Sequence, residues 1–120
     1  MEGTIGLAPH PSSSAEARSF VRAGLLRCGR QDILDDALLL TSKLVTNASC
    51  HARTGIVLEL HVGADGVRVA VSDESADRPH KRRRQSELES GRGLLLVDVL
   101  ADSWGVVEEG LGKAVWFQLA

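Results

Sequence analysis

The sequence has few cysteines and no long apolar stretch, and so lacks features that are typical of metal-binding, exported or membrane-spanning proteins. It contains two cysteines, Cys28 and Cys50, and neither has a second Cys or His at a zinc-ligand spacing. We interpret both as reduced thiols. No stretch approaches the length of about 18 apolar residues that a membrane span needs, and no basic patch precedes an apolar run at the N-terminus. We therefore expect a soluble, cytoplasmic protein that contacts no membrane.

A large excess of one charge is also missing. The chain has 14 Lys plus Arg against 16 Asp plus Glu, a formal net charge of -2, which gives no overall attraction to nucleic acid. A basic run at 81–84 has acidic residues on both sides, and no aromatic residue lies in the surrounding polar stretch to stack on bases. We interpret the run as solvated and expect no direct contact with nucleic acid.

Several catalytic motifs are absent as well. The sequence has no Gly-x-Ser-x-Gly elbow, no metalloprotease helix and no metal-ligating cluster. The segment 110–113 is not a P-loop, because Val107 stands where the first Gly is needed and Ala114 replaces the Ser or Thr. Gly91 and Gly93 do not begin a dinucleotide fingerprint, because Leu96 stands where the third Gly should be.

The residues that are present predict one compact domain spanning 1–120. The hydrophobic content is 43%, enough for a core without cross-links. Periodicity predicts three helices: one at 14–28, with a Ser13/Glu16 capping box and a stop at Gly29; one from a cap at Asp32 to about His51; and one from 94 to about 102. Alternation and turn residues predict a short edge strand at 4–8, a hairpin at 56–62 and 67–72, and a closing hairpin at 104–108 and 114–119. Hairpins imply antiparallel pairing, and three helices can cover one face of a sheet. The predicted fold is a two-layer α/β sandwich.

The middle helix carries polar residues beside its apolar stripe. Lys43, Asn47 and His51 recur at a spacing of four, next to a stripe of Leu40, Leu44 and Ala48. An Asn at this position costs a few kcal/mol if it is buried without partners. It therefore either bonds to neighbouring backbone or faces a ligand.

Two further segments allow a binding role. Asp73 ends a buried strand and can accept hydrogen bonds from a ligand amino group, or simply cap the loop that follows. The polar stretch 74–90 is longer than the loops of about 15 residues that small domains usually tolerate without a function. Gly91-Arg92-Gly93 then opens a helix, where backbone N–H groups can hold a phosphate or the glycines can serve only the turn.

Taken together, four segments carry a family resemblance: Leu44–Ala52 around Asn47, Val71–Ser75 around Asp73, Ser90–Val97 with its two glycines, and Gly112–Phe117. In this order and spacing the chain resembles the GHKL, or histidine-kinase-like, ATPases, and within them the small bacterial anti-sigma-factor serine kinases. The resemblance extends from about Ala15 to Leu119. It implies a Bergerat-type ATP-binding fold, with a mostly antiparallel mixed sheet covered on one face by three helices.

The resemblance also implies roles for individual residues. Asn47 matches the residue that holds Mg²⁺ against the phosphates of ATP or ADP, and Asp73 matches the residue that contacts the adenine amino group. The stretch 74–90 corresponds to a lid over the phosphates. Further nucleotide-binding positions are Gly91 and Gly93 behind the lid, Arg92 and Leu94 beside them, Ser75 in the turn after Asp73, and His51, Thr54 and Lys113 near the pocket. The implied partners are a sigma factor and an antagonist protein phosphorylated on serine, and a homodimer is also suggested.

The sequence departs from the family at the position of the catalytic base. Relatives carry a Glu one helical turn before the Asn, and Lys43 stands there in this chain. A lysine side chain is protonated at neutral pH and cannot take a proton from the attacking hydroxyl. Its ammonium group could instead approach the phosphates or extend into water. Ser75, where many relatives have Gly, is a smaller departure.

We therefore expect an ATP-binding regulator of the anti-sigma-factor type with weak or absent serine kinase activity. The alternative is a pure interaction module that has lost useful nucleotide affinity and works by docking alone. Nucleotide binding separates these two hypotheses.

Overall fold

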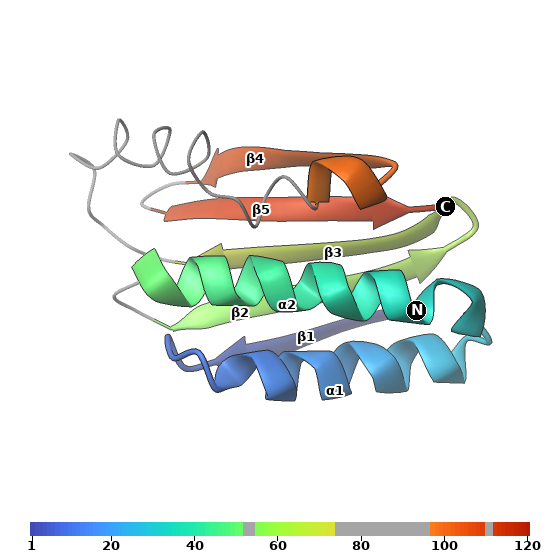
Figure 1. The fold of residues 1–120 in the computed structure, drawn as a ribbon, viewed down its shortest axis with the longest axis horizontal. Coiled ribbons are helices and arrows are strands. Elements are labelled where there is room, and N and C mark those ends of the chain that lie inside the picture. The colour runs from blue at the N-terminus through green and yellow to red at the C-terminus, as the bar shows by residue number, and fades with distance from the viewer. Residues whose placement is uncertain (52–54, 74–96, 110–111) are drawn as a thin grey trace.

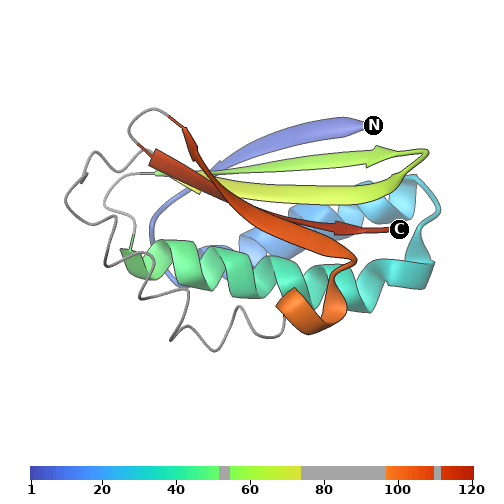
Figure 2. The same ribbon diagram turned by 90° about the horizontal axis from the view of Figure 1, so that it is seen from above.

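The structure, a computed structural model, describes residues 1–51, 55–73, 97–109 and 112–120, and it has two layers (Figures 1 and 2). Its elements are β1 (Glu2–Leu7), α1 (Ser13–Arg27), the 3-10 helix η1 (Gln31–Ile33), α2 (Leu34–His51), β2 (Ile56–Gly63), β3 (Gly66–Asp73), β4 (Ser103–Glu109) and β5 (Gly112–Leu119). The strands form one sheet in the order β1-β2-β3-β5-β4, and every neighbouring pair is antiparallel. The predicted two-layer α/β sandwich is confirmed.

The helices cover one face of this sheet. α1 and α2 lie side by side and antiparallel over β1, β2 and β3 (Figures 1 and 2). Residues 97–100 of the predicted third helix are helical and lie on the same side, and the helix ends at Leu100, two residues before its predicted end near Asp102 (Figure 2). The remainder of that predicted helix at its N-terminal end falls outside the described ranges.

The core lies between the two layers, where strand alternation and helix periodicity meet. Alternate residues of the central strands point toward the helices and are buried: Ile56, Leu58, Leu60 and Val62 of β2, Val67, Val69 and Val71 of β3, and Val115, Phe117 and Leu119 of β5. Opposite them lie Ala17, Val21 and Leu25 of α1 and Leu40, Leu44, Val45 and Ala48 of α2. The intervening strand residues face away from the helices, so the second face of the sheet is not covered by α1 or α2.

The end of α1 follows the prediction, because Gly29 stops the helix. Gly29 has φ +70°, a conformation that glycine adopts without strain. The N–H of Arg30 donates to the carbonyl of Leu25 at 2.8 Å, and the N–H of Gly29 donates to that of Leu26 at 3.2 Å. These two bonds form a Schellman motif, which satisfies carbonyls that the helix end would leave unpaired.

The two predicted helix starts are wrong in detail. Ser12, not Ser13, occupies the N-cap of α1 and makes no capping bond through its side chain. The Ser13 hydroxyl donates instead to the carbonyl of Ala8 at 2.8 Å. Asp32 lies inside η1, two residues before α2, and accepts two hydrogen bonds from Arg30 at 3.0 and 3.1 Å. These bonds from Arg30 lower the pKa of the exposed Asp32 carboxyl.

The β2–β3 hairpin depends on Gly66, which we expect to tolerate no side chain. Gly66 has φ +118°, and a Cβ atom at this position would collide with the carbonyl oxygen of Leu119 on β5. Gly66→Ala should lower the free energy of unfolding by about 1–3 kcal/mol, as measured by urea denaturation. The control is Gly6→Ala in β1, where a Cβ would meet nothing within 4 Å. Equal stability of the two variants would contradict this explanation.

A buried hydroxyl in α2 gives a second prediction of stability. Thr41 is fully buried, and among the described residues its Oγ1 has no hydrogen-bond partner. Thr41→Val should raise the free energy of unfolding by about 1 kcal/mol, because the desolvation cost of an unpaired hydroxyl is removed. Thr46→Val makes the same change at an exposed position of α2, where Oγ1 lies 3.1 Å from the Ser14 hydroxyl. The control should not gain stability, and a loss of stability in Thr41→Val would disprove the argument.

Candidate functional site

The candidate site lies at one end of the sandwich, where three elements meet. α2 ends there at His51, β3 ends at Asp73, and β5 begins at Gly112; this is the left end of the molecule in Figure 1. The arrangement follows from chain direction: β3 and β5 are antiparallel, so the end of one strand adjoins the start of the other. Residues that are far apart in the sequence are therefore neighbours at this end.

Asp73 and Lys113 are the charged residues that this end buries among those that the structure describes. Asp73 is 7% exposed and Lys113 is 8% exposed, and their Cα atoms are register partners across β3 and β5. Asp73 continues the buried alternation of Val69 and Val71, and Lys113 continues that of Val115 and Phe117. Both side chains therefore belong to the helix-covered face, where the predicted adenine contact of Asp73 would have to be made.

Asn47 and Lys43 lie on α2, at the border between its packed side and solvent. Asn47 is half-buried, and its neighbours Leu44 and Ala48 are buried against the sheet. Lys43, one turn earlier, is exposed. A long cationic side chain at such a position keeps its charged end in water. The helix thus has an amide at the edge of the core and an ammonium group at the surface.

The structure brings only part of the predicted site together. Asn47, Asp73 and Lys113 occupy elements that converge on one end, and His51 is the last residue of α2. Ser75, Gly91, Arg92, Gly93 and Leu94 lie outside the described residues, as do Thr54, the predicted lid at 74–90 and the basic run at 81–84. The roles expected for them stay predictions.

The donor set suits magnesium held mainly by a nucleotide. In the described part of the chain, no group of three or more His, Cys, Asp or Glu could hold a metal ion. Mg²⁺ commonly binds through one or two protein oxygens, substrate phosphates and water. The amide oxygen of half-buried Asn47 is a ligand of this kind, so the residues present fit Mg²⁺ held mainly by phosphate oxygens.

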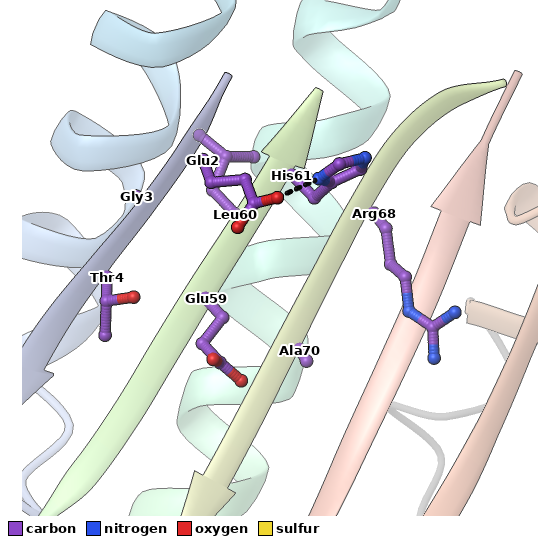
Figure 3. Close-up of a pocket in the computed structure, with 8 residues that line it drawn as sticks. All are labelled: Glu2, Gly3, Thr4, Glu59, Leu60, His61, Arg68 and Ala70. Atoms are coloured by element: carbon purple, nitrogen blue, oxygen red, sulfur yellow. Dashed lines mark ion pairs between the residues drawn. The ribbon is translucent and has the colours of Figure 1, made fainter. Parts of the chain in front are cut away.

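A shallow pocket lies on the uncovered face of the sheet (Figure 3). It has a volume of about 200 Å³ and is lined by Glu2, Gly3, Thr4, Glu59, Leu60, His61, Arg68 and Ala70. His61 Nδ1 lies 3.3 Å from a Glu2 carboxylate oxygen, and the Arg68 guanidinium stacks 4.2 Å from the centroid of the Trp116 ring. The sequence analysis did not predict this pocket, although the polar positions that alternate with the core residues of β2 and β3 indicate the face.

This pocket is a poor candidate for a nucleotide. Ligand pockets typically have volumes of about 300–1,000 Å³, larger than the space found here. Glu2 and Glu59 line it and would repel a polyphosphate, and the single Arg68 offsets only part of their charge. Asn47 of α2 and Asp73 of β3, the residues predicted to contact a nucleotide and Mg²⁺, lie on the helix-covered side of the sheet, opposite this pocket. No helix in the described ranges is long and apolar enough to cross a membrane.

Comparison with known proteins agrees with this geometry. The sequence model of one family, the histidine kinase-like ATPase domain, matches residues 7–119. A similar solved structure comprises the RsbU and RsbW domains of Rv1364c from Mycobacterium tuberculosis, with a TM-score of 0.75 and 19% sequence identity. The match covers 99% of this chain and 32% of that one, so this chain spans about a third of its length. No match was found among curated proteins.

At this identity the structural likeness shows the fold. The family match spans nearly the whole chain, including Asn47, Asp73 and Lys113. The chain therefore belongs to the family of histidine kinase-like ATPase domains.

Proposed function

We propose that this domain binds ATP and ADP at the end of the sandwich and acts as a regulator of the anti-sigma-factor serine kinase type. The observation that carries the proposal is the burial of Asp73 at the end of β3, on the face covered by α2. A position of this kind is suited to a directional contact with a ligand, and membership of an ATPase family supports a nucleotide as that ligand.

In the proposed complex the two described polar residues serve opposite ends of the nucleotide. The Asp73 carboxylate accepts a hydrogen bond from the adenine amino group, a charge-assisted contact that is stronger than a neutral one. The amide oxygen of Asn47 holds Mg²⁺, which neutralises part of the phosphate charge. His51 and Lys113 lie near the pocket, and the lid at 74–90 with Ser75, Gly91, Arg92, Gly93 and Leu94 completes it.

Phosphoryl transfer is proposed to be weak or absent. The exposed ammonium group of Lys43 stands one turn before Asn47, where relatives have a carboxylate. A protonated amine cannot accept a proton from an attacking serine hydroxyl. The domain would then keep ATP-dependent binding of partners and lose most of the transfer step.

The proposed partners are a sigma factor and its phosphorylatable antagonist. The similar structure from Mycobacterium tuberculosis has domains named RsbU and RsbW in one chain, which supports a role in association with other regulatory proteins. Affinity capture from the native cell, with and without ATP, would identify the partners of this domain.

Asp73→Asn should weaken ATP binding about tenfold or more, because a hydrogen bond to a charged acceptor is worth about 1.5–3 kcal/mol. Isothermal titration calorimetry with ATP and ADP, with and without Mg²⁺, measures this effect, and we expect micromolar binding by the wild type. The matched control is Asp65→Asn, an exposed aspartate in the β2–β3 turn at the far end of the sheet. Lack of nucleotide binding by the wild type would instead favour the interaction module without nucleotide.

Lys43→Glu should raise serine phosphorylation of the captured antagonist by about a hundredfold, the low end of what a positioned general base contributes. Transfer of labelled phosphate from ATP measures the rate. Lys43→Gln removes the same charge without adding a base, and this control should stay as slow as the wild type. Rapid transfer by the wild-type protein would refute the proposed impairment.

A further inference from the structure

The described part of the chain buries two charged side chains, and both lie in one row of the sheet. They are Asp73 and Lys113, each more than nine-tenths buried. Taking a single ion out of water costs several kcal/mol, so a buried lysine requires a nearby negative charge or strong acceptors. The proposed function uses Asp73 directly but gives Lys113 no role beyond its place near the pocket.

The register places the two residues next to each other. Asp73 and Lys113 are directly opposite across β3 and β5, and such partners have Cβ atoms about 4.5–5.5 Å apart. Inward from this row on the same face lies the pair Val71 and Val115, which is apolar and buried. On the β2 side Asp73 is opposite Ile56, which is also apolar and buried. Lys113 is therefore attached to the sheet directly beside the residue that the proposed function assigns to adenine.

We infer that Lys113 is a positioning residue that acts through Asp73 and makes the site selective for an adenine amino group. This inference rests on the proposed function. A carboxylate has about four lone-pair positions, so Asp73 can accept hydrogen bonds from a lysine and from a ligand at the same time. A hydrogen bond donated by Lys113 would fix the orientation of the carboxylate. Without Lys113 the carboxylate loses the orientation that the amino group requires.

This role differs from direct contact between Lys113 and the phosphates. If the ammonium group bound phosphate, its removal would weaken all nucleoside triphosphates equally. If it acts through Asp73, its removal weakens only those nucleotides whose base donates a hydrogen bond to Asp73. Base discrimination therefore separates the two roles, and also separates the proposed role from a general effect on stability.

The test compares ATP with purine riboside triphosphate, which lacks the exocyclic amino group, by calorimetry on the full chain. The wild type should bind ATP about tenfold more tightly than the analogue. Lys113→Met should lose about tenfold in ATP affinity and less than about twofold in affinity for the analogue, so that the preference disappears. Lys113→Arg retains a positive charge and should retain most of the preference. In the Asp73→Asn background, Lys113→Met should cause no further change.

The control is Arg68→Met, because Arg68 of β3 is an exposed cation on the opposite face of the same sheet. This variant should keep the preference for ATP. Circular dichroism and thermal melting report whether Lys113→Met folds; if it does not, Lys113→Gln is measured against the same thresholds.

Equal losses for both nucleotides, or an unchanged preference, would overturn the inference and leave ATP binding itself intact. Failure of the wild type to bind either nucleotide would defeat the proposed function, and the inference with it. The two failures are therefore distinguishable.

Discussion

The packing of one stripe of α2 against the inner face of β3 and β5 is the interaction on which the candidate site depends. Leu44 and Ala48 are buried against the sheet, and this burial fixes the rotation of the helix about its axis. Because residues on a helix have fixed angular offsets, Asn47 is then held at the border of the core. On the sheet side, the burial of Val71 and Val115 fixes which face Asp73 and Lys113 occupy. Hydrophobic packing thus positions the polar residues.

The order of the strands in the sheet decides which residues are neighbours, and residue periodicity alone does not predict that order. β4 precedes β5 in the sequence but lies at the edge, and β5 is inserted beside β3. If β4 had paired with β3 instead, Asp73 would have a different strand beside it and Lys113 would lie further away. The sequence predicts that 104–108 and 114–119 form a hairpin, but hairpin chemistry does not say which of its strands joins the rest of the sheet. The juxtaposition of Asp73 and Lys113 could therefore not be predicted from the sequence.

Local structure was predictable where a residue type strongly favours one backbone conformation. Gly29 ends α1 because glycine is favoured at a positive φ, and the predicted stop is correct. Ser13 and Asp32 were assigned to caps wrongly, because short polar side chains can bond to several nearby groups. Ser13 bonds to the carbonyl of Ala8, and Asp32 pairs with Arg30. Such competition depends on how the preceding loop folds, which the residue pattern does not specify.

For the candidate site, the positions of some residues could be predicted from the sequence pattern, but their roles could not. Periodicity placed Asn47 beside the apolar stripe of α2 and Asp73 at the end of a buried strand, and the structure has both there. Their roles toward magnesium and adenine came from the family resemblance, since an Asn or an Asp has structural uses that the pattern alone does not exclude. The burial of Lys113 was not predicted, because the position of a strand within a sheet decides whether its first residue is covered.

The burial of two opposite charges in one row argues that this end of the sheet is specialised for something other than stability. A buried ion pair is often no more stabilising than apolar residues of similar size, and sometimes less. The adjacent row shows the apolar solution in the same strands, where Val71 faces Val115 in the core. An apolar pair at positions 73 and 113 would also pack in the core, and it would avoid the cost of desolvating an aspartate and a lysine. Under the proposed function, the apolar pattern stops at Asp73 and Lys113 because a bound nucleotide contacts this row.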